Sequence, residues 1–386
     1  MPITTSARSF FRVREFKMVG VIHASTTRTE VAIAGGGIIG LALGLELRLR
    51  GMSVAVLERG QAMRAASWAA GGMLAVYDPQ NPFALMPLAR RSVQLYPDWL
   101  RRIEELSGLP VPMRTHEALQ WVGMDVREGI ATVEDIRRLA PGLRELEGVP
   151  FRHLDEASVD PRDLCAALPK AFTAAGGRLL EGCSVVEVQQ TEGGVRILTT
   201  AGEFAAQNFV NCCGAWAGAA IKGLSRIPVQ PVKGQMVEML CPPEQLQCVV
   251  RSPHVYLIPR GDGRVTVSAT IEHAGFDARV DDRTISGLIQ AAQRLLPELA
   301  LSTPPKSWAG LRPGTPDDLP VMGPALDPRT RHPLQRCWLA AGHYRDGILL
   351  APGTARVMAQ AITGESTDLP LDPFTAARFL WVIDTQ

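Results

Sequence analysis

A glycine-rich turn between a short apolar strand and an apolar helix constrains this 386-residue chain more than any other feature. Residues 29–34 read TEVAIA, an apolar and β-branched run that is typical of a buried strand. Gly35, Gly37 and Gly40 follow in G-x-G-x-x-G spacing and open a helix that we expect to end near Gly51. This pattern predicts the first strand, turn and helix of a nucleotide-binding α/β fold.

Each glycine of the turn meets a separate steric need, and an acidic residue completes the unit. The first permits the tight turn, the second lets the backbone approach a pyrophosphate, and the third lets the helix lie close on the strand. The helix N-terminus offers N–H groups and a partial positive charge to phosphates. Residues 53–57 predict a second strand, and Glu58 follows where a carboxylate accepts the hydroxyls of an adenosine ribose and repels a 2′-phosphate. The motif fits both NAD and FAD, and a tight turn without a ligand is the alternative interpretation.

Charge and composition exclude several classes of protein. Forty basic and 39 acidic side chains leave a net charge of +1, which favours neither nucleic acid nor an anionic membrane surface as a partner. No run reaches about 18 uninterrupted apolar residues, so we expect no membrane span. The seven cysteines are odd in number and form no C-x-x-C pair. We therefore expect buried thiols, a reducing and hence cytoplasmic compartment, and no structural metal.

The first 28 residues differ from the rest of the chain. They lack both a continuous apolar segment and a cleavage site, so a secretion signal is not predicted. We expect residues 1–28 to be a disordered leader, or an extension upstream of a start at Met18, with a transit peptide as the alternative. The leader has a single acidic residue, Glu15, against five basic ones, Arg8, Arg12, Arg14, Lys17 and Arg28.

Patterns beyond Glu58 predict further helices and a second, antiparallel sheet. Small residues at 65–73 suit either close approach to a flat ligand or an ordinary helix start. Asp160 is a predicted N-cap. Pro304-Pro305 is expected to end the helix predicted at 286–296. Helices are predicted at 81–107, 132–139, 286–296 and 348–362, and strands at 119–123, 204–213, 229–240, 255–270 (with a turn at 261–263) and 338–341.

Together these elements predict an α/β protein with two domains. One is a Rossmann-like dinucleotide-binding domain assembled from discontinuous segments, and the other is an α+β substrate-binding domain with a mainly antiparallel sheet. We place the first at residues 29–84, 155–226 and 317–365, the second at 85–154 and 227–316, and a C-terminal tail at 366–386.

Six motifs, in order along residues 29–365, resemble the glycine oxidases of the thiamine pathway, within the D-amino-acid oxidase and sarcosine oxidase superfamily of FAD-dependent amine oxidases. The carriers are AIAGGGIIGL with Glu58, SWAAGGML, VKGQM, YLIPR, WAGLRPGTPD and AGHYRDGILLAP. The resemblance implies FAD rather than NAD. It also implies non-covalent FAD, because the flavin-linking cysteine of sarcosine oxidases is absent from residues 311–316.

The same resemblance implies which residues hold the cofactor. The residues at 347–349 would direct backbone N–H groups at the pyrimidine end of the flavin. The expected FAD-binding set is Gly35, Gly37, Ile38, Gly40, Glu58, Arg59, Ser67, Ala70, Gly71, Met73, Val185, Gly214, Gly347, Ile348 and Leu349.

A second set of residues is implied to bind the substrate. Arg312 matches the arginine that holds the substrate carboxylate, and a guanidinium suits that task because it pairs bidentately. Tyr256 matches an aromatic residue beside that carboxylate, Arg345 a second arginine at the cavity, and His254 a nearby histidine. From the residues alone, Arg312 in a loop before Pro-Gly is equally consistent with a solvated arginine, and His254 with a core or surface histidine.

The pocket residues and the reaction follow from the resemblance too. Met73 and Ile271 are expected to line the substrate pocket, although Ile271 and Ala66 stand where the compared family has methionine and threonine. The expected reaction is hydride transfer from Cα of glycine, sarcosine or a small D-amino acid to FAD, then to O₂, with no obligatory protein base. A D-amino-acid dehydrogenase or a related enzyme with another acceptor, and a non-catalytic nucleotide-binding module, are the alternatives. A homo-oligomer, dimeric or tetrameric, is expected.

Overall fold

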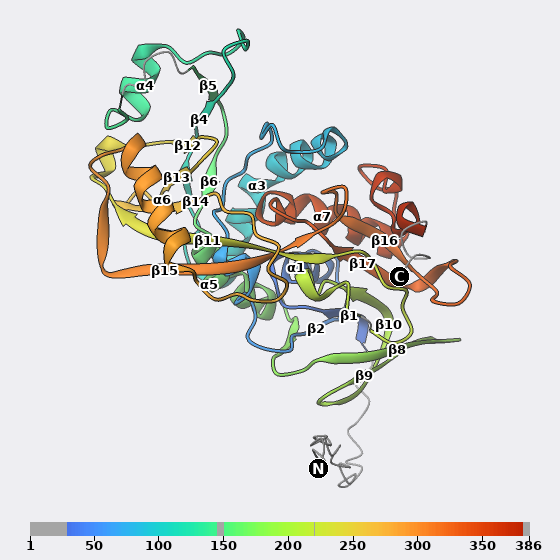
Figure 1. The fold of residues 1–386 in the computed structure, drawn as a ribbon. Helices are drawn as coiled ribbons and strands as arrows, with labels where there is room; N and C mark the ends of the chain where they lie inside the picture. The colour runs from blue at the N-terminus through green and yellow to red at the C-terminus, as the bar shows by residue number, and fades with distance from the viewer. Residues whose placement is uncertain (1–28, 145–149, 220, 381–386) are drawn as a thin grey trace, which may run out of the picture.

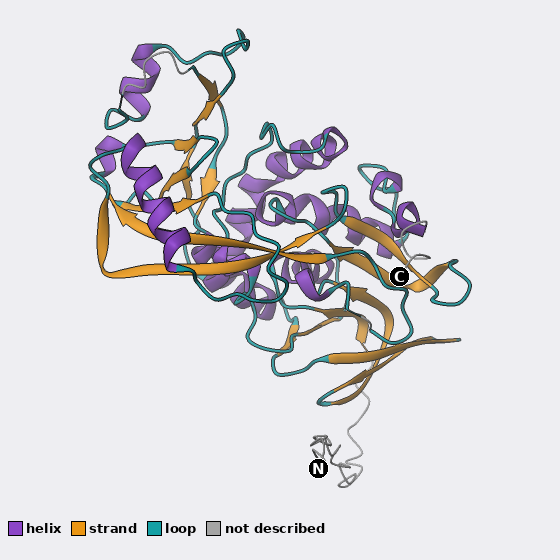
Figure 2. Cartoon of the chain, in the orientation of Figure 1, coloured by secondary structure: helices purple, strands orange, loops and turns teal. Residues whose placement is uncertain are grey.

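Two β-sheets organise the chain, one on each side of a shared boundary (Figures 1 and 2). The computed structural model describes residues 29–144, 150–219 and 221–380. The predicted leader, residues 1–28, and residues 381–386 of the predicted tail lie outside the described residues.

The larger sheet contains the predicted nucleotide unit at its centre. Its order is β16-β17-β10-β1-β2-β7, with β9 paired to β10 and β8 paired to β9. The strands from β17 to β7 run parallel, whereas β16, β9 and β8 are antiparallel additions. The predicted strand at 29–34 is confirmed as β1. The strands are β1 (Thr29–Ala34), β2 (Val54–Leu57), β7 (Arg178–Leu180), β8 (Val185–Thr191), β9 (Gly194–Thr199), β10 (Gly202–Asn211), β16 (Val321–Leu326) and β17 (Pro333–Ala341).

Four long helices share one apolar core with this sheet: α1 (Ile38–Leu49), α3 (Met86–Ser107), α5 (Pro161–Ala174) and α7 (Gly347–Thr363). Asp160 caps α5 as predicted, because its side chain accepts from the backbone N–H of Arg162 at 3.0 Å. We assigned α3 to the substrate domain, yet it packs against α5 and α7. The domain bounds remain a prediction.

The second sheet has the order β15-β11-β14-β13-β12-β4-β5 and is antiparallel except where β12 meets β4. The predicted turn at 261–263 joins β13 and β14, so that part of the antiparallel prediction is confirmed. A separate pair contains β3 (Met113–Thr115) and β6 (Ser158–Val159). The strands of the second sheet are β4 (Ala118–Trp121), β5 (Phe151–Leu154), β11 (Gln230–Leu240), β12 (Val249–Arg251), β13 (Tyr256–Pro259), β14 (Arg264–Ser268) and β15 (Ala300–Gly314).

Two predictions around β15 were wrong. Pro304-Pro305 does not end a helix: α6 (Asp282–Leu295) stops earlier, and the prolines lie within β15. The strand accepts them because the register with β11 shifts there and residues 302–305 have no pairing partner. Arg312 lies not in a loop but on β15, opposite Val232 of β11. This pairing gives Arg312 a fixed main chain.

The remaining helices are short. They are α2 (Ala66–Ala69) and α4 (Val133–Leu139), with single turns at η1 (Phe83–Leu85), η2 (Gly214–Trp216), η3 (Pro243–Gln245), η4 (Asp372–Phe374) and η5 (Ala376–Phe379). Within the described ranges, no helix combines the length and apolar character needed to cross a membrane.

Candidate active site

The glycine turn is shaped by close main-chain contacts. Gly35 has a φ of +106°, and a Cβ added there would lie 2.3 Å from the carbonyl oxygen of Cys212 at the end of β10. A Cβ at Gly40 would lie 2.0 Å from the carbonyl oxygen of Gly35. Gly37 differs, because a Cβ there would meet only the Ser67 hydroxyl, at 3.5 Å. The first and third glycines therefore hold the turn together, and the second leaves space in front of it.

Glu58 closes the turn from the end of β2. Its carboxylate accepts from the backbone N–H of Gly36 at 2.7 Å and from that of Gly60 at 2.9 Å. A carboxylate has about four acceptor positions, so acceptor capacity remains for the hydroxyls of a ribose. The side chain is thus held in place by the turn that it was predicted to complete.

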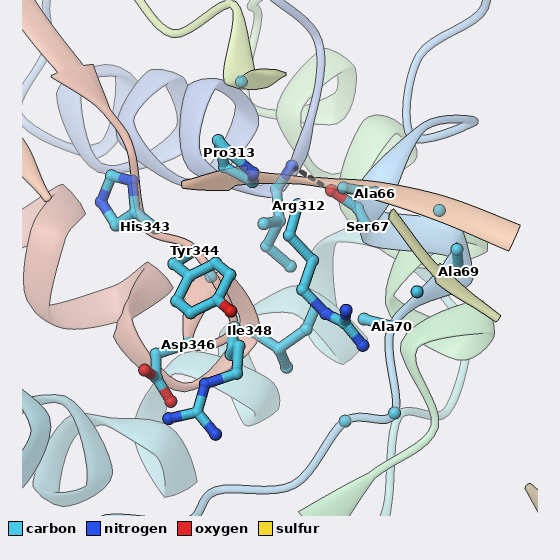
Figure 3. A pocket seen from close by; sticks show the side chains of 18 of the residues that line it. Ala66, Ser67, Ala69, Ala70, Arg312, Pro313, His343, Tyr344, Asp346 and Ile348 are labelled. Atoms are coloured by element: carbon cyan, nitrogen blue, oxygen red, sulfur yellow. Dashed lines mark hydrogen bonds between the residues drawn. The ribbon is translucent and has the colours of Figure 1, made fainter. Parts of the chain in front are cut away.

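A cavity extends from the glycine turn to the second sheet and holds about 1210 Å³ of space, open solvent at its mouth included. One wall comes from the turn, α2 and the segment that leads into α7, and the other from β11, β13, β14 and β15 (Figure 3). The cavity therefore lies where the two sheets meet.

Arg312 enters the cavity from β15 (Figure 3). Its Nη1 donates to the carbonyl oxygen of Thr270 at 2.9 Å, and no acidic side chain of the described residues lies within ion-pair distance. Gly234 makes room for the guanidinium, because a Cβ there would lie 2.3 Å from both Nη atoms. Burial lowers the pKa of Arg312, the usual effect of removing a cation from water. A half-buried cation without a counter-ion favours an anionic ligand.

Comparison with known proteins agrees with this geometry. Residues 30–361 match the family described as FAD dependent oxidoreductase (DAO). The chain belongs to this family. It is 33% identical to the glycine oxidase of Pseudomonas aeruginosa, across 90% of this chain and 98% of that protein. It is 37% identical to the bifunctional protein ThiO/ThiG of a Synechocystis species, but spans only 54% of that protein, about half its length.

Solved structures give the same result for the fold of this FAD-dependent oxidoreductase. The glycine oxidase of Geobacillus kaustophilus superposes with a TM-score of 0.82 at 32% identity, covering 91% of this chain and 99% of that one. The predicted α/β fold class is therefore confirmed.

The residues around the glycine turn fit the FAD of this family. The first turn of α1 contains no acidic residue and its N-cap, Gly37, makes no side-chain bond, so the positive end of the helix is left for an anion. The Ser67 hydroxyl accepts from the N–H of Ile38 at 3.0 Å (Figure 3). A second helix N-terminus, that of α7 at Gly347, also lines the cavity. Two helix N-termini, those of α1 and α7, thus line the cavity at separate places.

Most of the predicted cofactor residues line this cavity, although their roles remain predictions. The others do not line it. Gly35 and Gly40 allow the close main-chain contacts of the turn, Glu58 accepts hydrogen bonds from the turn, and Leu349 is buried in α7. Val185 and Arg59 are not among the lining residues, and Arg59 instead stacks 3.6 Å above the Trp216 ring. The lining members of the set are Gly37, Ile38, Ser67, Ala70, Gly71, Met73, Gly214, Gly347 and Ile348.

The predicted substrate residues divide into two groups. Tyr256, Arg312 and Arg345 line the cavity together. His254 is exposed on the turn between β12 and β13, and Ile271 is 49% exposed; neither lines the cavity. Tyr256 points inward because alternate residues of β13 face opposite sides of the sheet. Burial raises the pKa of Tyr256, so its hydroxyl stays neutral and can donate a hydrogen bond.

Arg345 lines the cavity but already has partners. Its Nη1 donates to Gln80 Oε1 at 2.7 Å, and its Nη2 donates to Asn81 Oδ1 at 3.3 Å. The Nη1 atom also lies 3.6 Å from Asp78 Oδ1. The guanidinium therefore fastens residues 78–81 to the start of α7, and a role in substrate binding remains a prediction.

Sequence reasoning missed several cavity residues, among them the polar side chains of Asp78, Tyr344 and Asp346. Asp346 and Tyr344 stand inside the GHYRDG motif, of which only Arg345 was given a substrate role, so the signal was present but was not used. Asp78 follows no recognisable pattern, and only the contact between its segment and Arg345 brings it to the site. Together with Arg312, these residues make the substrate end of the cavity strongly polar.

Proposed function

We propose that this chain is an FAD-dependent amino-acid oxidase and that glycine is its main substrate. Glycine, water and O₂ would be converted into glyoxylate, ammonia and H₂O₂, and sarcosine and small D-amino acids are further candidates. The names of the relatives at 33% and 32% identity, both glycine oxidases, support the choice of glycine. The substrate assignment and the roles of individual residues form the proposal.

One observation carries it: the guanidinium of Arg312, which has no acidic partner among the described residues, lies in the same cavity as the glycine turn. A substrate carboxylate would supply the missing counter-ion, with two parallel hydrogen bonds in a site that excludes most water. Each such charged contact contributes about 1.5–3 kcal/mol. A small amino acid bound in this way would extend its Cα and amine toward the rest of the cavity.

The chain's own residues would bind and orient the substrate. Arg312 would hold the carboxylate, and the neutral hydroxyl of Tyr256 would donate a further hydrogen bond. Apolar side chains of Met73, Met236 and Ile258 line the cavity and would exclude water. When bound, FAD supplies the hydride acceptor and then returns the electrons to O₂. The imine left on the substrate hydrolyses to the oxo acid and ammonia.

An oxygen-electrode screen of the purified, yellow protein with glycine, sarcosine and D-alanine tests the proposal. We expect oxygen uptake and one H₂O₂ for each glyoxylate formed. A colourless protein that gains no flavin on reconstitution would reject an oxidase and favour a nucleotide-binding module. A yellow protein that glycine reduces, but that O₂ reoxidises slowly, would instead indicate a dehydrogenase with another acceptor.

Three further expectations are part of the same proposal. The resemblance stated from the sequence places such oxidases in the thiamine pathway, where the imine serves thiazole synthesis. All seven cysteines are free, which supports a reducing, cytoplasmic compartment. A homo-oligomer, dimeric or tetrameric, is expected and is measured directly by light scattering.

A further inference from the structure

Asp346 occupies an unusual position at the substrate end of the cavity. It is the N-cap residue of α7, where aspartate normally accepts from the first backbone N–H groups of the helix, but its side chain makes no such bond. Its main chain is held at both sides: its N–H donates to His343 O at 2.9 Å, and its carbonyl accepts from Leu350 N–H at 2.8 Å. The carboxylate is therefore free of the helix and lines the cavity (Figure 3).

The surroundings of Asp346 leave its carboxyl group available. The charged groups around it are Arg345 from its own turn, Asp78 from the segment before η1, and Asp318 from the turn between β15 and β16. The nearby amide of Asn81 favours the ionised form of the carboxyl group and so lowers its pKa. No basic side chain of the described residues pairs with it. Burial raises the pKa of Asp346 to about 7, Arg345 opposes that rise, and Asp78 adds to it. The group can therefore exchange a proton near neutral pH.

The other titratable side chains of the cavity are less suited to accept a proton. Asp78 already accepts from the N–H of Gln80 at 2.9 Å and lies beside Arg345. His343 is bonded to Thr354 at 3.1 Å, and burial lowers its pKa to about 3. The pKa values of Tyr256 and Tyr344 are raised, so both are already protonated.

We propose that Asp346 accepts a proton from the ammonium group of the bound substrate before hydride leaves Cα. This inference rests on the proposed function. An amino acid arrives as a zwitterion, and hydride transfer needs the nitrogen lone pair to form the C=N bond. In this step one N–H bond breaks, its electron pair stays on nitrogen, and an O–H bond forms on Asp346. The proton passes to water after the product leaves.

The test follows flavin reduction by saturating glycine, without oxygen, between pH 5.5 and 9.5. In the wild-type protein we expect the rate to rise up to about tenfold per pH unit and to level off above the pKa of Asp346, near 7. In Asp346→Asn the rate should be ten- to a hundredfold lower at pH 7.5 and should keep rising to pH 9.5, because deprotonation then follows the substrate ammonium. Asp346→Glu, which keeps an acceptor, should restore a plateau.

Asp318→Asn is the matched control. It removes a negative charge facing Asp346, and asparagine tolerates the φ of +57° at this position. We expect a plateau rate within twofold of wild type and a midpoint that shifts to lower pH by less than one unit. A structural role is checked with acetate, a carboxylate without an amine, whose affinity in Asp346→Asn should stay within threefold.

Two results would overturn the inference while leaving the proposed function intact. One is a wild-type pH profile in Asp346→Asn. The other is a parallel loss of rate and acetate affinity, which would show that Asp346 only supports the cavity. If wild-type protein binds flavin but no amino acid reduces it, the proposed function fails, and this inference fails with it.

Discussion

The two ends of the cavity are constructed in different ways. The nucleotide end consists of main chain from one continuous stretch, Gly35 to Glu58, in which glycines provide space and helix α1 provides donors. The substrate end consists of side chains from four distant segments, represented by Asp78, Tyr256, Arg312 and Asp346. A main-chain site depends on the absence of side chains, whereas a side-chain site depends on where the fold brings charges together. Substitutions at the nucleotide end should therefore reduce flavin binding, whereas substitutions at the substrate end should change the kinetics with the amino acid.

The largest effect is expected at the nucleotide end from Gly40→Ala. The added Cβ would lie 2.0 Å from the Gly35 carbonyl oxygen, a main-chain atom that cannot move without opening the turn. We expect a cost of about 3 kcal/mol and protein purified without flavin, measured by the ratio of flavin to protein absorbance. Gly287→Ala on α6, where no atom lies within 4 Å, is the control and should keep its flavin. Full flavin occupancy in Gly40→Ala would contradict the main-chain description of this end.

The next largest effect is expected at the substrate end from Arg312→Ala. Loss of one desolvated, charged contact should cost about 3 kcal/mol, which is more than a hundredfold in KM for glycine. Arg312→Lys should recover little, because an ammonium cannot form the bidentate pair. Flavin content should stay unchanged in both variants. Arg279, which is exposed beyond β14, provides the control Arg279→Ala. Unchanged KM values would remove Arg312 from the site.

A smaller effect is expected from Glu58→Ala, which removes a side chain from the main-chain end. The N–H groups of Gly36 and Gly60 lose their acceptor. The ribose contact proposed for Glu58 would be lost as well. We expect FAD to bind roughly ten- to a hundredfold more weakly, about 1.4–2.8 kcal/mol. The rate of flavin reduction in the reconstituted protein should be unaffected. Fluorescence titration of FAD measures the affinity. The FAD affinity of Glu58→Gln, which keeps one acceptor oxygen, should lie between those of wild type and Glu58→Ala. Equal affinities would show that the turn needs no carboxylate.

The smallest effect on activity accompanies a change in stability: Asp346 makes the free energy of unfolding depend on pH. Its pKa is raised from 3.8 to about 7, so the folded protein binds more protons than the unfolded chain in this range. The free energy of unfolding should therefore fall as pH rises through this window. Between pH 5 and pH 8.5 we expect Asp346→Asn to gain about 3 kcal/mol relative to wild type, measured by urea unfolding of the flavin-free proteins. A constant difference would indicate that burial does not raise this pKa.

Local patterns were sufficient where neighbouring residues decide the structure. β1, the glycine turn and α1 were predicted from spacing alone, and the Asp160 cap of α5 from one residue before a helix. Prediction failed where a segment distant in the sequence decides the local structure. Pro304-Pro305 suggested the end of a helix, but the register shift against β11 lets the prolines lie inside β15. His254 matched a family position; its side chain is exposed and does not line the cavity, and its role remains a prediction.

Motif resemblance predicted the presence of Arg345 in the site but not its partners. Its guanidinium bonds to Gln80 and Asn81, residues that are more than 260 positions away in the chain. No local pattern indicates such a contact, because those side chains meet only when the segment after α2 crosses the start of α7.

The order of glycines, apolar residues and Glu58 determined the nucleotide fold by itself, because each requirement acts between residues close along the chain. The order of the six motifs along the chain then predicted the family. Only the tertiary structure decided that Arg312 has no counter-ion among the residues it describes, that Arg345 is already bonded, and that Asp346 faces the cavity instead of capping its helix. The physical reason is that burial and charge pairing depend on all neighbours in space, and most of those neighbours are remote in sequence.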